Sequence, residues 1–166
     1  MSCMKLILED TRNKPEKNAY IRQQLEKLGY AVERCRLYTG DYTFPTNQSI
    51  CIDTKQDLQE VCGNVTQQHK RFQSECERAQ MAGIKLVILI KEASIKSLDE
   101  VPKWYNWRLK FSPRATTGKQ LWKIMSKTTE KYGVEWRFAT PSKMGKTIIE
   151  ILEESNDRNR IHEVAN

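Results

Sequence analysis

The sequence predicts a three-layer α/β domain with a central mixed β-sheet. Short apolar runs, typical of buried strands, alternate along the chain with segments of helical periodicity. The chain has 166 residues, enough for one domain with a full hydrophobic core and too few for two ordinary ones. We therefore expect one domain over residues 1–154 and a polar, flexible C-terminal tail over residues 155–166.

The first third of the chain predicts a strand, a helix and three further strands. Lys5–Glu9 is a short apolar run that polar residues end. Pro15 suits the first turn of a helix, whose apolar residues recur at helical spacing until Gly29. Alternation with period two and a turn at Thr39-Gly40 then predict a three-strand meander over residues 31–37, 41–44 and 49–54.

The remainder predicts helices on both sides of a buried strand. Lys85–Ile90 is the most apolar run in the chain and is expected to form a central strand. Residues 94–116 have weak periodicity and two prolines, so we expect a loop-rich crossover with one short helix. The other expected elements are helices over residues 57–61, 66–82, 117–132 and 142–153 and a strand over residues 134–139.

Positive charge is concentrated in the second half of the chain. The net charge is +7 and the pI about 9.2, yet residues 103–146 alone carry +9, which leaves −2 for the rest. A basic half favours a polyanionic partner such as DNA, although basic residues also form ordinary solvated faces. Within that half, four lysines recur every four residues and share one helix face: Lys119, Lys123, Lys127 and Lys131.

Several classes of protein are excluded by composition. The longest apolar run is far shorter than the roughly 20 residues of a membrane span, so we expect no membrane partner. The N-terminus lacks the apolar stretch of a secretory signal. Five cysteines show no metal-binding spacing and cannot all pair, which favours reduced thiols and a cytoplasmic location.

Three aspartates stand where predicted strands end or turn: Asp10, Asp41 and Asp53. Lys55 lies two residues after Asp53, so both side chains point to one face of a strand. Asp41 and Asp53 on adjacent strands could hold Mg²⁺, which takes one or two carboxylates and completes its shell with water and substrate phosphate. From spacing alone, the same pattern is also common on solvated strand faces.

The order of these residues resembles a nuclease signature. Asp10-Thr-Arg12, Gly40-Asp41-Tyr42 and Asp53-Thr-Lys55 follow one another as in the XPF-type nuclease domain, a member of the restriction-endonuclease-like, PD-(D/E)XK superfamily. Residues 71–78 and 85–92 resemble that family's basic helix and the apolar strand that follows it. The resemblance covers about residues 4–92.

The resemblance implies a metal-dependent DNA endonuclease that hydrolyses phosphodiester bonds, with preference for branched or flap DNA. Asp41 and Asp53 would hold Mg²⁺ or Mn²⁺, Asp10 would lie near the metal as a third acidic group, and Lys55 would be the catalytic lysine. Small stand-alone relatives occur in phages and prophages, which implies a role in DNA recombination or repair in the cytoplasm of a bacterium or phage-infected host.

We expect DNA contacts from Arg12, from the start of the second long helix and from the lysine face. Arg12 could instead pair with a neighbouring carboxylate, and the helix start could be an exposed polar turn. The expected DNA-binding residues are Arg12, Gln68, Lys70, Arg71, Lys119, Lys123 and Lys127.

Three departures from the family pattern support a rival hypothesis. Asn13 stands where the family has glutamate, Thr54 replaces an arginine, and Asp57 is the nearest match to an aspartate after the lysine. Either Asp10 or Glu16 would have to replace the lost glutamate. The rival is a non-catalytic DNA-binding or scaffolding module with the same fold.

Two features leave substrate placement open. No helix-hairpin-helix pair follows residue 92, so duplex placement would come from the basic half, a homodimer or an accessory protein. Four aromatic residues could stack on unpaired bases, although their spacing favours core packing or an interface: Trp104, Tyr105, Trp107 and Trp122.

Overall fold

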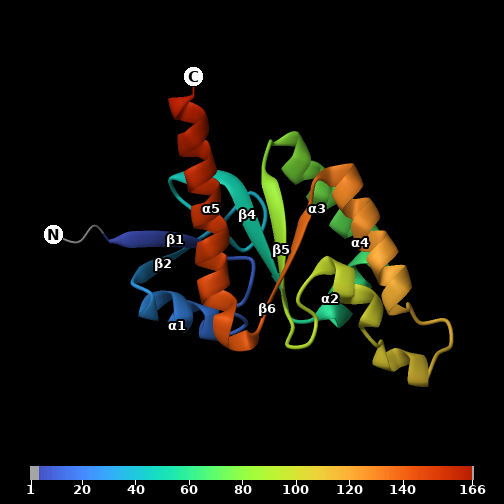
Figure 1. Ribbon diagram of the computed structural model, residues 1–166. Coiled ribbons are helices and arrows are strands. Elements are labelled where there is room, and N and C mark those ends of the chain that lie inside the picture. The colour runs from blue at the N-terminus through green and yellow to red at the C-terminus, as the bar shows by residue number, and fades with distance from the viewer. Residues whose placement is uncertain (1–3, 166) are drawn as a thin grey trace.

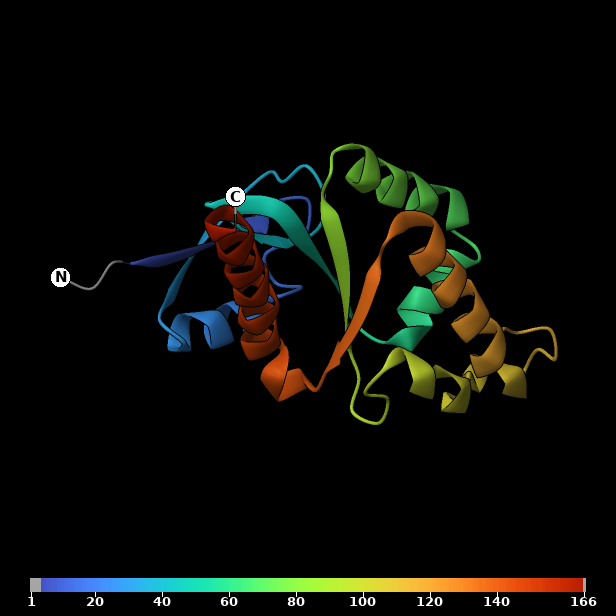
Figure 2. The ribbon, with the colours of Figure 1, turned by 45° about the horizontal axis from the view of Figure 1, so that its top comes forward.

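The computed structural model describes residues 4–165 and has a six-stranded mixed sheet covered by helices on both faces (Figures 1 and 2), which confirms the predicted fold class. The strand order is β2-β1-β3-β4-β5-β6. The strands are β1 (Lys5–Asp10), β2 (Tyr30–Cys35), β3 (Tyr42–Phe44), β4 (Asn47–Lys55), β5 (Lys85–Lys91) and β6 (Glu135–Ala139). The helices are α1 (Ala19–Lys27), α2 (Leu58–Val65), α3 (His69–Met81), α4 (Gly118–Tyr132) and α5 (Met144–Val164), with 3₁₀ helices η1 (Leu98–Lys103), η2 (Trp107–Lys110) and η3 (Pro141–Lys143).

The expected three-strand meander is wrong, because β1 lies between β2 and β3. Helix α1 returns the chain so that β2 pairs parallel with β1, as a strand-helix-strand unit requires. The chain then passes to the other edge of β1, where β3 pairs antiparallel with β1 and with β4. Strand β5 has a neighbour on each side, as expected of a buried strand, but it is second from the sheet edge.

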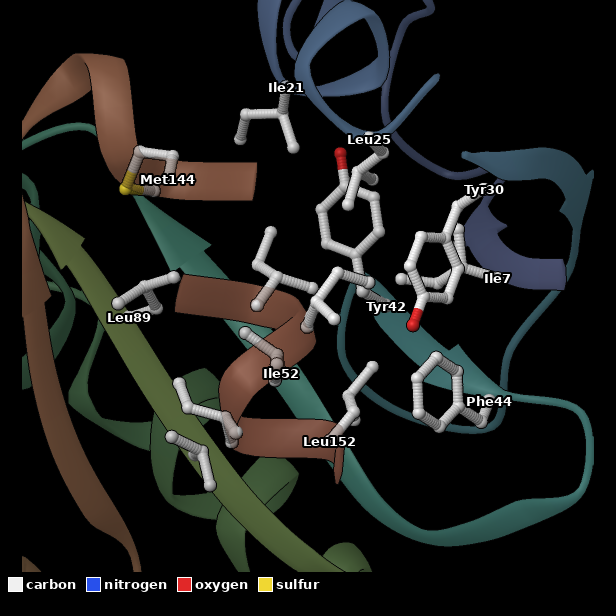
Figure 3. Close-up of a cluster of buried hydrophobic side chains, with 14 of the residues drawn as sticks. Ile7, Ile21, Leu25, Tyr30, Tyr42, Phe44, Ile52, Leu89, Met144 and Leu152 are labelled. Carbon is white, nitrogen blue, oxygen red and sulfur yellow. The ribbon is translucent and has the colours of Figure 1, made fainter. Parts of the chain in front are cut away.

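Alternation along the inner strands divides the apolar side chains between two cores. Ile50 and Ile52 of β4 pack with α1 and α5, and this cluster is drawn in Figure 3. Leu86, Ile88 and Ile90 of β5 pack on the opposite face against α2, α3 and α4. Because β4 follows the same alternation, Asp53 and Lys55 point to the α2–α3 face, away from Ile50 and Ile52.

The C-terminal boundary differs from the expectation. Helix α5 does not end at Glu153 but continues to Val164, so the segment expected to be a frayed tail is helical. Asn47 of β4 donates to Oδ1 of Asn156 over 3.0 Å, which ties this extension to the sheet. The flexibility of residues 155–166 stays a prediction.

The two helices before β5 also differ in extent from the expectation. The first, α2, continues to Val65, and the second, α3, begins at His69. Among the described residues, no helix is long and apolar enough to cross a membrane. The four described cysteines, Cys35, Cys51, Cys62 and Cys76, are free thiols, while Cys3 lies outside the described residues.

A buried glutamate joins the N-terminal half of the sheet to α1. Glu9 is 2% exposed and accepts a hydrogen bond from Arg22 at 2.7 Å and another from the Tyr42 hydroxyl at 2.9 Å. Nε of Arg34 lies 2.9 Å from the same carboxylate. Burial and the nearby Glu9 raise the pKa of Tyr42, so the phenol stays a donor.

We expect Glu9→Gln to lower the free energy of unfolding by about 3 kcal/mol, because two partly buried guanidinium groups would lose their shared, buried counter-ion. Urea denaturation followed by circular dichroism measures this loss. Glu33→Gln, an exposed position on β2, is the control and should change stability by less than about 0.5 kcal/mol. Equal effects of the two substitutions would contradict a structural role for Glu9.

Candidate active site

A polar cavity of about 320 Å³ lies where β1 and β4 end and β3 begins, and α2 and α3 close its other side. It brings together seven of the residues expected from the sequence: Asp10, Arg12, Asp41, Asp53, Lys55, Gln68 and Arg71. Five acidic and five basic side chains line it, so the cavity combines sites for a cation with groups that attract phosphate.

Backbone geometry at Gly40 places Asp41 in the cavity. Gly40 has a φ of +74°, and an added Cβ would lie 3.0 Å from Cβ of Cys51 and 3.1 Å from the carbonyl oxygen of Ile52. Only glycine fits both this conformation and this space. The amide of Asp41 then donates to the Ile52 carbonyl at 2.7 Å, and its carbonyl accepts from the amide of Asp10 at 2.8 Å.

The Asp41 carboxylate is held by two of the three residues that depart from the family pattern, Asn13 and Thr54. Its Oδ2 accepts from the amide and hydroxyl of Thr54 at 2.8 and 2.7 Å, and its Oδ1 accepts a short hydrogen bond from Nδ2 of Asn13. Neutral donors therefore stand where the family pattern has a glutamate and an arginine. They orient the carboxylate without adding charge of either sign.

Asp53 and Lys55 form an ion pair on the same side of β4. Nζ of Lys55 lies 2.8 Å from Oδ2 of Asp53, and both side chains are about 90% buried. The ammonium group of Lys55 offsets the charge of this buried oxygen. A buried carboxylate beside a second carboxylate in a polar cavity is suited to a divalent cation.

Burial and neighbouring charges shift the pKa values of Asp41 and Lys55. Burial, and next the charge of Asp53, raise the pKa of Asp41 to about 7, although its hydrogen bonds with Thr54 and Asn13 act in the opposite direction. Burial lowers the pKa of Lys55, but the charge of Asp53 and contact with it outweigh that effect, so the net shift is upward. Lys55 is therefore an ammonium group at neutral pH.

Asp10 and Arg12 contact each other at the rim of the cavity. Nε of Arg12 donates to Oδ2 of Asp10 at 2.7 Å, and the amide of Leu37 donates to Oδ1 at 2.9 Å. Arg12 also donates to the Leu37 carbonyl. Its pairing with a carboxylate is thus observed, while 42% exposure leaves its outer edge available to a phosphate.

Other expected residues lie outside the cavity. Lys70 is exposed on the first turn of α3, and the α4 lysines are exposed on the outer face of that helix. Asp57 caps α2, accepting from the amide of Glu60 at 2.8 Å, so it is not the acidic group expected after the lysine. Glu16, the alternative replacement for the lost glutamate, is exposed and does not line the cavity.

Two cavity residues on α3 escaped the sequence analysis. Glu75 and Arg78 share a helix face with Gln68 and Arg71, a spacing of three and four residues that could have identified them. Glu75 lines the same cavity as Asp41 and Asp53, and burial and the charge of Asp53 raise its pKa. Glu75 is therefore a candidate for the acidic group that the sequence analysis assigned to Asp10 or Glu16.

The side chains fit a hard divalent cation held largely by water and substrate. Among residues 4–165, no three acidic, histidine or cysteine side chains converge on one point. Mg²⁺ commonly uses only one or two carboxylates, and Asp41 and Asp53 are the buried, mutually repelling pair in this cavity. The proximity of these two buried carboxylates is the feature that favours such an ion.

A comparison with family models matches residues 10–150 to the ERCC4 domain. The chain belongs to the ERCC4 domain family, the XPF-type nucleases. No curated protein matches the sequence. Two solved structures of XPF from Aeropyrum pernix, one of them in complex with DNA, share the fold of this ERCC4 domain with a TM-score of 0.65 and 19% identity, over 93% and 95% of this chain. The chain spans 66% and 69% of those structures.

The raised pKa of Asp41 predicts a pH dependence of stability for this ERCC4 domain. The folded state binds that proton more tightly than the unfolded chain, so the group's stabilising contribution is lost as pH rises from 3.8 to about 7. In EDTA, urea denaturation at several pH values between 3.8 and about 7 measures the free energy of unfolding of the parent and of Asp41→Asn. The parent value minus the variant value should fall as the pH rises. A constant difference would contradict the shift.

Proposed function

We propose that this ERCC4 domain is a divalent-metal-dependent DNA endonuclease that hydrolyses phosphodiester bonds, with Mg²⁺ or Mn²⁺ as its cofactor. The observation that carries this proposal is the cavity in which Asp41, Asp53 and Lys55 meet beside basic residues of α3. A selection for branched or flap DNA is part of the proposal. It is supported by family membership and by the DNA complex of XPF from Aeropyrum pernix.

In this mechanism, Asp41 and Asp53 hold the cation and Asp10 adds a further negative charge nearby. When bound, the cation supplies Lewis-acid activation of the scissile phosphate and of a water molecule. Thr54 and Asn13 keep the Asp41 carboxylate fixed through their hydrogen bonds. A fixed ligand avoids reorganisation when charge develops at the phosphorus.

Lys55 acts as a positive charge in the proposed reaction. Its ammonium group lies against Asp53 and is shielded from solvent, so it is positioned to stabilise the extra negative charge on the phosphate oxygens when water attacks. Its raised pKa makes it a poor acceptor of the water proton at neutral pH. Glu75, a carboxylate with a raised pKa in the same cavity, is better suited to accept that proton.

Two surfaces contact the DNA in the proposed complex: the cavity and the lysine face of α4. Arg71 and Arg78 line the cavity and can hold the phosphates that flank the cleaved bond. The exposed lysines of α4 can contact a duplex at a distance from the cavity. We also propose that a homodimer or an accessory protein completes this placement. The proposed setting is DNA recombination or repair in the cytoplasm of a bacterium or phage-infected host.

The first test of the proposed activity is cleavage of labelled linear, flap and four-way DNA with Mg²⁺ or Mn²⁺. EDTA should abolish cleavage. We expect Asp53→Asn and Lys55→Ala each to reduce the rate by roughly 100-fold or more. Asp53→Asn removes the charge that would hold the cation, and Lys55→Ala removes a positive charge that offsets negative charge in the transition state. DNA affinity without metal should persist or rise in Asp53→Asn, since a negative charge facing the phosphates is lost.

Asp57→Asn is the matched control for Asp53→Asn. Asn caps helices as well as Asp does, and position 57 lies outside the cavity, so cleavage should stay near the parent rate. Parent-like cleavage by Asp53→Asn would show that the assigned site is wrong. A parent protein that cuts none of the DNAs with either metal would make the non-catalytic DNA-binding module the better hypothesis.

Salt dependence of DNA binding tests the lysine face of α4. Each duplex phosphate contact contributes roughly 0.9 to the slope of log affinity against log salt. Alanine at Lys119, Lys123 and Lys127 should therefore reduce that slope by roughly 0.9 per lysine that contacts DNA. Lys27→Ala, at the end of α1, is the control. An unchanged slope in the triple variant would show an ordinary solvated face.

A further inference from the structure

The segment between η1 and α4 separates its aromatic residues into two groups. Trp104 is partly buried and packs against the core on the α2–α4 face, as does Trp122 of α4, which agrees with the packing favoured by their spacing. Tyr105, Trp107 and Phe111 instead remain exposed, at 58%, 52% and 79%. We call these three residues the aromatic platform.

Two rings of the platform contact each other. Trp107 and Phe111 meet edge to face with centroids 6.0 Å apart, and the guanidinium carbon of Arg108 lies 5.8 Å from the centre of the Trp107 ring. Aromatic surface of this size is costly to leave in water, and a contiguous patch is typical of an interaction surface. A planar ligand can stack on such rings.

The platform is held in place rather than carried on a loose loop. Asn106 is 1% exposed, donates to the Thr116 carbonyl at 2.9 Å and accepts from the amide of Arg108 at 3.0 Å. At the base of the segment, a Cβ on Gly118 would lie only 2.5 Å from the Trp104 carbonyl oxygen. This close packing fixes the platform before any ligand binds, so stacking would cost little ordering entropy.

Charge around the platform indicates the class of ligand. Residues 101–129 contain seven lysines and arginines and no acidic residue. Beside the platform, a groove of about 430 Å³ is lined by Arg108 and Arg114 and by uncharged residues, with no carboxylate. A groove with positive charge, bordered by exposed rings, complements a strand that has both phosphates and unpaired bases.

The groove adjoins the catalytic cavity through α2 and the turn after it. Gly63 and Gln67 line the groove, whereas Asn64 and Gln68, their immediate neighbours, line the cavity. In Figure 1 the segment that carries the platform lies beside α2 at the lower right. One DNA strand could therefore pass from the cavity across the end of α2 to the platform.

We infer that the aromatic platform and its groove bind an unpaired DNA strand, with bases stacked on Trp107 and Phe111 and phosphates on Arg108 and Arg114. This inference rests on the proposed nuclease function and specifies its substrate: a DNA with a single-stranded arm next to the cleaved bond. Because every base has a π-face, binding at the platform tolerates any sequence.

Fluorescence anisotropy in EDTA tests the inference without cleavage, with a labelled oligothymidylate of about a dozen residues and a duplex of equal length as probes. The double variant Trp107→Ala with Phe111→Ala should bind the single strand roughly 5- to 100-fold more weakly, because that is the affinity that stacking of a base on an aromatic ring contributes. Duplex affinity should change less than about two-fold, because the lysine face of α4 is intact.

Three further variants separate stacking from charge and from a general loss of surface apolarity. Trp107→Phe should retain most of the single-strand affinity while losing the Trp107 fluorescence quenching that accompanies binding. Arg114→Ala should lower the single-strand salt slope by roughly 0.7. Met81→Ala removes an 89% exposed apolar side chain at the C-terminal end of α3. This variant is the control for a general loss of surface apolarity.

Single-strand affinity within two-fold of the parent in a folded double variant would overturn the inference and leave the platform as a docking surface for a protein. An equal loss of duplex binding would also overturn it. Loss of cleavage in Asp53→Asn tests the nuclease proposal alone, because single-strand binding in EDTA does not require that residue. The two proposals can therefore fail independently.

Discussion

The Asp41 residue joins the three strands that surround the cavity. Its amide binds β4 at Ile52, its carbonyl binds β1 at Asp10, and its carboxylate is held by Thr54 of β4. The same residue therefore connects β1 to β4 and presents its carboxyl group to the candidate active site. Gly40 is the condition for this arrangement, because a side chain there would collide with β4.

Burial of Asp41 beside Asp53 is unfavourable for the isolated protein. Burial, and next the repulsion between two carboxylates that share a small cavity, raise the pKa of Asp41. Hydrogen bonds from Thr54 and Asn13 offset part of that cost. A divalent cation would offset the rest, so under the proposed function the residues that destabilise the metal-free fold are the ones that would hold the cofactor. Functional sites commonly carry such a cost, and the surrounding structure tolerates it.

The departures at Asn13 and Thr54 acquire a structural explanation here. In place of a charged pair, two neutral donors fix one carboxylate, and the acidic and basic groups are supplied by α3 through Glu75, Arg71 and Arg78. The chain keeps a balanced cavity although its strand motifs differ from the family pattern.

The sequence alone determined the alternation of strands and helices, most of the strand positions, and the identity of Asp41, Asp53 and Lys55 as a group. These features follow from local periodicity and from short motifs, which depend only on neighbours along the chain. Tertiary structure alone decided that β1 separates β2 from β3, that Asp57 caps a helix, and that Glu75 joins the cavity. It also decided which aromatic residues are exposed. Each of these depends on which surfaces meet in space, and separation along the chain does not encode that contact.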